Sequence, residues 1–237
     1  MRILLTRPEA DAADTALVLR DMGHEVLVDP VLDIRFRDDV ELDTTGVQAW
    51  LATSRNGVRA LAHAGADRGL PLLAVGGSTA ELARQGGFRD VRDADGDVTD
   101  LVRLATETLD PDAGSLFHAA GSDVAGDLAG QLRESGHAVI RKALYDAVAS
   151  RQLRPATRQA LHRREIDVVL FYSPRSAACF ADLVAASGTL DECRTIAACC
   201  ISERAAAALK DVPFRLVLPA RRPRQSALLD LLKQCVL

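Results

Sequence analysis

Apolar residues along the chain fall into short continuous runs, separated by longer stretches in which they recur at helical spacing. Residues 3–6 and 115–119 form two such runs, of the kind that makes strands buried on both faces of a sheet. The helical stretch after each run ends near an arginine and a glycine suited to a left-handed C-cap, and another short β-rich run follows. The pattern predicts two β-α-β units.

The two units repeat each other in sequence. Residues 19–26 read LRDMGHEV, and residues 132–139 read LRESGHAV. After each unit come two further segments that run from an apolar strand through a tight turn into a helix. The chain is therefore expected to follow the order A-B-A′-B′, with segments near residues 1–34, 35–112, 113–147 and 148–237.

Strands that alternate with helices at this spacing predict parallel sheets covered by helices. The expected fold class is α/β, with two similar flavodoxin-like or Rossmann-like lobes. The charged stretches 33–45 and 146–155 each follow an A-type unit, and they are the expected linkers at which the chain crosses between lobes. The periodicity leaves open whether A pairs with B, or A with B′ and B with A′.

The composition of the chain agrees with two domains, and its charge argues against nucleic acid as a ligand. The 237 residues are 48% hydrophobic, enough for about two domains of roughly 100–150 residues each. The net charge is −4 and the arginines are scattered, which argues against a nucleic-acid partner. Of 29 basic residues only three are lysine. This excess of arginine reflects either coding bias or a ligand rich in carboxylates or phosphates, which guanidinium groups bind well.

The cysteines and the opening residues favour a protein of the reducing cytoplasm. Five cysteines lie in the last quarter without a C-x-x-C pair, which fits neither a disulfide framework nor a zinc site. The first apolar run is too short for a signal-peptide core, and no stretch approaches the length of a membrane span. We expect a cytoplasmic protein with no membrane partner.

Candidate binding residues lie in six strand-to-helix turns. Ligands of open parallel sheets bind beyond the carboxyl ends of the strands, where helix N-termini present unpaired N–H groups. These turns combine glycine or a small hydroxyl residue with arginine, which suits an anion, although any single serine or threonine there can equally be a helix cap. We expect the turns to line one cleft between the lobes. The candidates are Thr6, Arg7, Thr53, Ser54, Arg55, Asn56, Gly76, Ser78, Thr79, Gly121, Ser122, Ser173, Arg175, Ser176 and Ser202.

Several familiar sites are excluded. The sequence has neither G-x-G-x-x-G nor G-x-x-x-x-G-K-[ST], which argues against dinucleotide and ATP sites, and the absence of H-E-x-x-H or a His/Cys cluster argues against a metal. His118 ends a strand beside the expected cleft and is a candidate ligand or proton donor. Tyr145 breaks the repeat, because the first copy carries Leu32 there. It is either a neutral proton donor or a buried interface residue.

Taken in order, these motifs resemble the uroporphyrinogen-III synthase family over essentially the whole chain. The residues that carry the resemblance are 4–8, 30–32, 52–58, 75–76, 79–80, Gly121, Tyr145 and 171–176. The resemblance implies one lobe built from both chain ends, residues 1–34 plus 148–237, and a second from residues 35–147. It also implies two crossing strands between them, so that A pairs with B′ and B with A′.

The resemblance also implies a reaction. A linear tetrapyrrole with eight carboxylates, hydroxymethylbilane, loses its hydroxyl as water and closes with inversion of ring D to uroporphyrinogen III. The implied enzyme is a cyclising hydro-lyase of tetrapyrrole biosynthesis, a monomer without cofactor or metal, with a transient contact to the preceding pathway enzyme. Tyr145 matches the family's usual proton donor, whose loss is expected to slow turnover without abolishing it. The alternative is a non-catalytic two-lobe binding module for an anionic small molecule.

Two turns depart from the family pattern. The last turn reads Ser202-Glu203-Arg204-Ala205 where the family often has Gly-Pro followed by Thr, and Glu203 is poorly suited to a site beside a carboxylate. The turn at residues 118–121 lacks the arginine often found before the glycine. His118 is the candidate substitute for that arginine.

Overall fold

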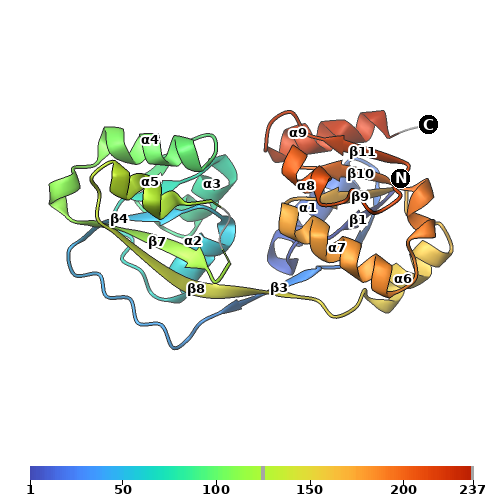
Figure 1. The fold of residues 1–237 in the computed structure, drawn as a ribbon, viewed down its shortest axis with the longest axis horizontal. Coiled ribbons are helices and arrows are strands. Elements are labelled where there is room, and N and C mark those ends of the chain that lie inside the picture. Colours follow the sequence, from blue (N-terminus) through green and yellow to red (C-terminus); the bar gives the residue numbers. More distant parts are fainter. Residues whose placement is uncertain (124–125, 236–237) are drawn as a thin grey trace. The chain divides into compact units, whose positions relative to one another are not determined.

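A computed structural model describes residues 1–123 and 126–235. The chain divides into two compact units (Figure 1). One, called the terminal unit below, comprises Met1–Asp33 and Val148–Leu237; the other, the central unit, comprises Ile34–Ala147.

The terminal unit is built on a five-stranded sheet of order β11-β10-β9-β1-β2, in which neighbouring strands run parallel. Its strands are β1 (Arg2–Leu5), β2 (Glu25–Val28), β9 (Val168–Phe171), β10 (Ala197–Cys200) and β11 (Leu216–Pro219). Its helices are α1 (Glu9–Asp21), α6 (Pro155–His162), α7 (Pro174–Ala186), α8 (Glu203–Ala207) and α9 (Gln225–Asp230), with short 3-10 turns η2 (Asp191–Thr195) and η3 (Leu231–Gln234).

Both faces of this sheet are buried, which explains why its inner strands read as continuous apolar runs. Successive side chains of a strand point to opposite faces. Leu4 therefore packs in the core that includes Phe180 of α7, while Leu5 packs in the second core, with Leu19 of α1 and Leu228 of α9. The carboxyl ends of the parallel strands meet along one edge, where the turns into the helices begin.

The central unit has a six-stranded sheet of order β3-β8-β7-β4-β5-β6. Its strands are β3 (Leu32–Phe36), β4 (Val47–Ala52), β5 (Leu72–Ala74), β6 (Val91–Asp93), β7 (Ser115–Gly121) and β8 (Val139–Ala149). Its helices are α2 (Arg55–His63), α3 (Gly77–Gln85), α4 (Val98–Thr108) and α5 (Leu128–Glu134), with a 3-10 turn η1 (Pro111–Ala113).

Two cores cover the faces of this sheet as well. On one face the buried Trp50 of β4 meets Phe117 of β7 edge to face, with ring centroids 5.2 Å apart, and Leu61 of α2 packs beside them. On the other face Leu116 of β7 packs with Leu101 of α4 and with residues of α5. The face covered by α2 and α3 is called the α2 face below, and the face covered by α4 and α5 the α5 face.

The α/β class with two sheets dominated by parallel pairs is confirmed. Both expected linkers are strand in part: β3 includes residues 33–36, and β8 continues to Ala149. β3 lies at the edge of its sheet and exposes Asp33 and Arg35. Charged side chains are common on edge strands, and they make the sequence of such a strand look like that of a linker.

Within the described residues, no helix is both long and apolar enough to cross a membrane.

Candidate functional site

A tyrosine and a serine meet at the carboxyl ends of the strands in the central unit. The hydroxyls of Ser54, which follows β4, and Tyr145 of β8 lie 3.0 Å apart and are hydrogen-bonded. Ser54 is the N-cap of α2, and its Oγ accepts the N–H of Gly57 at 3.1 Å. The cap fixes the Ser54 side chain, and Ser54 in turn fixes the position of the Tyr145 hydroxyl.

Two glycines make this arrangement possible by allowing close approach. A Cβ on Gly121 would lie 3.0 Å from Cε2 and from Cζ of the Tyr145 ring. A Cβ on Gly57 would lie 2.8 Å from the carbonyl oxygen of Ala119, so the first turn of α2 rests directly on β7. Gly121, which was expected to contact ligand, therefore also has a packing role, as does Gly57.

Next to Ser54, the Thr53 hydroxyl lies 3.4 Å from Nε2 of His118 on β7. His118 is only 1% exposed, and its Nδ1 has no hydrogen-bond partner among the described residues. Burial, with a smaller contribution from the charge of Arg141, lowers the pKa of His118 to about 4. The imidazole is therefore neutral at ordinary pH.

An ion pair fixes β8 just after Tyr145. Arg37 donates two hydrogen bonds of 2.9 Å to the carboxylate of Asp146. These bonds, and a further one from the Ser122 side chain, lower the pKa of Asp146 to about 2. The main-chain N–H of Ser122 donates to the carbonyl of Tyr145 at 3.0 Å.

The remaining candidates of the central unit lie at the starts of α2 and α3. Gly76 is the N-cap of α3, Ser78 is exposed and Thr79 is buried. The guanidinium of Arg55, the first residue of α2, donates to the carbonyl of Ser78 at 3.4 Å, which joins the two turns. The Asn56 amide oxygen accepts a hydrogen bond from Arg59.

In the terminal unit, the side chains of the first turn are engaged within the protein. Thr6 is fully buried, and its Oγ1 donates to the carbonyl of Leu170 at 3.0 Å. The guanidinium of Arg7 lies 4.0 Å from the centre of the Tyr172 ring and donates to Thr15 Oγ1 at 2.9 Å. These two side chains were expected to bind ligand. In the structure they contact other protein groups and hold the turn in shape.

The other terminal-unit turns begin with capping serines. Ser173 accepts the N–H of Ser176, and the buried Ser176 hydroxyl donates back to the Ser173 carbonyl. Arg175, between them, is half-buried at the start of α7. Ser202 caps the five-residue helix α8 by accepting the N–H of Ala205 at 3.3 Å.

Sequence reasoning missed three charged residues of the central unit: Arg37, Arg141 and Asp146. None of them lies on a strand-to-helix turn. Arg141 is the neighbour of His118 in the parallel pairing of β7 with β8. That neighbour relation depends on which strands pair in the sheet, and the periodicity of the sequence does not show which strands pair. Among the described residues, no group of three or more His, Cys, Asp or Glu side chains could hold a metal ion.

The buried His118 predicts that the central unit loses stability as the pH falls from 6.5 towards 4. Between these values the unfolded chain binds a proton that the folded chain, with a His118 pKa of about 4, does not. The free energy of unfolding therefore falls by at most about 1.4 kcal/mol per pH unit through this window, and the His118 effect is absent above it. Thermal melts of the wild type and His118→Gln, compared at about pH 5 and about pH 7, measure the effect. An equal loss of stability in both proteins would contradict it.

Comparisons with known proteins agree with the fold. The sequence profile of one family, described as uroporphyrinogen-III synthase HemD, matches residues 13–230. A uroporphyrinogen-III synthetase structure from Helicobacter pylori is similar, with a TM-score of 0.70, 17% identity and all of both chains covered. A mutant uroporphyrinogen III synthase from Thermus thermophilus gives a TM-score of 0.57 and 20% identity, with 99% of this chain and 98% of that chain covered. The search of curated proteins gave no match.

The fold and the polar turns at its strand ends define a two-unit α/β enzyme. Because the family profile spans most of the sequence, the chain belongs to the uroporphyrinogen-III synthase family. The enzyme is accordingly a cyclising lyase of porphyrin biosynthesis.

Proposed function

We propose that the enzyme converts hydroxymethylbilane into uroporphyrinogen III, and that Tyr145 is the acid that assists departure of the substrate hydroxyl. The observation that carries this proposal is the 3.0 Å hydrogen bond between Ser54 and Tyr145. It holds a phenol hydroxyl at the carboxyl end of the sheet, where ligands of parallel α/β folds bind.

The hydrogen bonds of Ser54 favour Tyr145 as a donor. Ser54 Oγ already accepts the Gly57 N–H. When the Ser54 hydroxyl donates to Tyr145, the phenol oxygen is the acceptor of that bond and keeps its own proton for transfer to the substrate. Protonation of the substrate hydroxyl by Tyr145 releases water and leaves a reactive azafulvenium cation, the protonated azafulvene. Ring closure then expels one proton from the attacked pyrrole, which restores Tyr145. Water is lost and no electrons are exchanged, so the reaction balances without a cofactor.

We propose that most of the rate enhancement comes from the geometry in which the enzyme binds the substrate. The azafulvene is reactive by itself, so the enzyme has to fold the chain, exclude water and favour inversion of ring D over direct closure. In the central unit, main-chain N–H groups at the starts of α2 and α3, with Arg55, are suited to the substrate carboxylates. We propose substrate contacts for Thr53, Ser54, Arg55, Asn56, Gly76, Ser78, Thr79, Gly121 and Ser122.

In the terminal unit we propose contacts by Arg175 and by main-chain groups of the turns at Ser173, Ser176 and Ser202. Thr6 and Arg7 have protein partners for their side chains, so we assign them to shaping their turn. We further propose that the two units act as the lobes 1–34 plus 148–237 and 35–147 of a cytoplasmic monomer. A transient contact with the preceding enzyme would deliver the unstable substrate.

Consumption of substrate distinguishes this enzyme from a binding module. Hydroxymethylbilane generated in solution is expected to disappear faster with the protein than without it, with a rate proportional to protein concentration. A protein whose melting temperature rises with hydroxymethylbilane but which does not accelerate its loss would be a binder, and the proposal would fail.

A further inference from the structure

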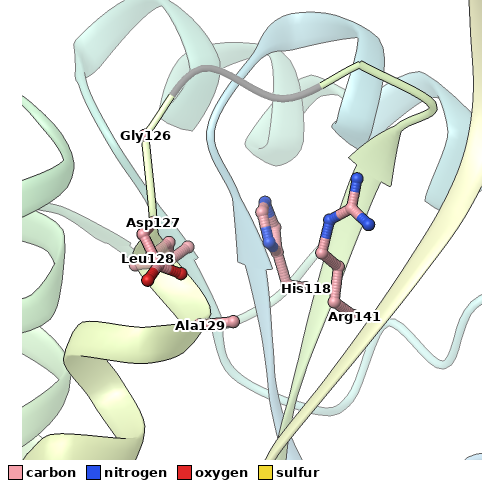
Figure 2. A pocket seen from close by; sticks show the side chains of 6 residues that line it. All are labelled: His118, Gly126, Asp127, Leu128, Ala129 and Arg141. Carbon is pink, nitrogen blue, oxygen red and sulfur yellow. The ribbon is translucent and has the colours of Figure 1, made fainter.

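A polar pocket lies on the α5 face of the central unit. Its volume is about 240 Å³, and it is lined by His118, Gly126, Asp127, Leu128, Ala129 and Arg141. Figure 2 shows the imidazole of His118 between the Asp127 turn and the side chain of Arg141. A water molecule takes up about 30 Å³ of liquid, so the pocket has room for a carboxylate group with the carbons that carry it.

Arg141 gives this pocket a cation without a counter-ion. Its Nη2 donates to the carbonyls of Gly121 and Ser122, both at 3.3 Å. Of the carboxylates in the described part of the chain, none forms an ion pair with it. Guanidinium presents five N–H donors in a planar fork, so donors remain for a ligand after these two long bonds. The group best matched to such a fork is a carboxylate or a phosphate.

His118 supplies a second unsatisfied group in the same pocket. Its Nδ1 is buried and has no partner among the described residues, while Nε2 lies 3.4 Å from the Thr53 hydroxyl. When Thr53 donates to Nε2, the neutral ring carries its proton on Nδ1. A buried N–H without an acceptor costs free energy, so this atom favours a ligand that brings an oxygen.

Asp127 does not cancel this preference. Its Oδ1 accepts the N–H of Gly130 at 2.8 Å as the N-cap of α5, so the carboxylate already has a protein donor. Arg141 and His118, by contrast, lie side by side on the same sheet face, because they are register partners in β7 and β8. Arg141 and His118 thus line the pocket on the side of the sheet, and Asp127, the N-cap of α5, lines it on the side of the helix.

Gly121 connects the pocket to the proposed acid. Its carbonyl accepts the bond from Arg141, and its Cα faces the Tyr145 ring, which packs on the opposite, α2 face of the sheet. An anion held by Arg141 would therefore be held close to the strand end from which Tyr145 acts.

We propose that the pocket lined by His118 and Arg141 is a subsite for one carboxylate side chain of the substrate. This assignment rests on the proposed function, since the substrate is the source of the carboxylate. Arg141 donates to the carboxylate oxygens from one side and His118 from the other. The pair does the work of the cation missing from the turn before Gly121.

Kinetics of Arg141→Gln test the subsite, with Arg133→Gln as the matched control. Arg133 is also exposed, lies in the same unit and donates to one main-chain carbonyl, that of Val139, but it does not line the pocket. Loss of one charge-assisted hydrogen bond is expected to raise the KM for hydroxymethylbilane about tenfold in Arg141→Gln. We expect kcat and the melting temperature to stay near wild type, and Arg133→Gln to match wild type throughout.

Three results would overturn the subsite: an unchanged KM in Arg141→Gln, an equal rise of KM in both variants, or a loss confined to kcat. In each case, turnover by the wild-type enzyme would still support the proposed function. A second measurement is independent of turnover. Sodium propionate, added against sodium chloride at equal ionic strength, is expected to shift the His118 Cε1–H resonance in the wild type and Arg133→Gln, and not in Arg141→Gln. No shift in the wild type would also overturn the subsite.

Discussion

Replacing Tyr145 with phenylalanine is expected to lower kcat about tenfold, with the melting temperature and the isomer produced unchanged. The substitution removes one hydroxyl and little volume, so the ring still packs against Gly121. General acid catalysis contributes about 10²-fold or more where proton transfer limits the rate. We expect less here, because binding geometry supplies most of the catalysis. The measurement is the initial rate of macrocycle formation at saturating hydroxymethylbilane.

The matched control for this substitution is Tyr172→Phe, at the only other tyrosine of the chain. Tyr172 lies in the terminal unit with its ring against the guanidinium of Arg7, and it has no part in the proposed proton transfer. Its loss of a hydroxyl is expected to leave kcat within about twofold of wild type, well below the effect of removing a catalytic acid. Unchanged turnover in folded Tyr145→Phe would show that Tyr145 is not the acid.

The largest effect on stability is expected from Trp50→Ala. Trp50 is fully buried, its ring packs against Phe117, and its Nε1 donates to the carbonyl of Asp67 at 2.8 Å. The substitution leaves a cavity and an unpaired carbonyl, and it should destabilise the central unit by about 3–5 kcal/mol. Denaturant unfolding followed by circular dichroism measures the loss, since Trp50 is the chain's one tryptophan and fluorescence is lost with it.

Leu17→Ala serves as the control for this second prediction. Leu17 is 60% exposed on α1, and its truncation is expected to change the free energy of unfolding by less than about 0.5 kcal/mol. A loss below about 1 kcal/mol in Trp50→Ala would contradict the packing of the α2 face around this side chain.

The α/β architecture could be predicted because buried strands and helices require apolar residues at characteristic spacings in the sequence. The continuous apolar strands and the repeated helix ends at residues 19–26 and 132–139 together indicated parallel sheets covered by helices. The edges of the sheets could not be recognised in this way. β3 exposes every second residue to water, so its sequence resembles the charged linker that was expected there.

The strand-to-helix turns could be predicted from the sequence, but the contacts between their side chains could not. Ser54 and Tyr145 were both singled out, yet they lie 91 positions apart. The pairing order of β4, β7 and β8 brings them together, and the periodicity of the sequence does not show that order. For the same reason Arg141 was missed. Thr6 and Ser176 show a second difficulty. A hydroxyl at a turn can bond to the protein's own main chain as readily as to a ligand, and both of these hydroxyls donate to main-chain carbonyls.

The central claim is that this protein closes a linear tetrapyrrole with inversion of one ring. The measurement that tests it most directly is the isomer composition of the product formed from hydroxymethylbilane, oxidised to porphyrin and separated by chromatography. The fold, the family and the position of Tyr145 predict mainly the type III isomer, in an amount that follows the enzyme concentration. Exclusive formation of the type I isomer, as in spontaneous closure, would contradict the claim.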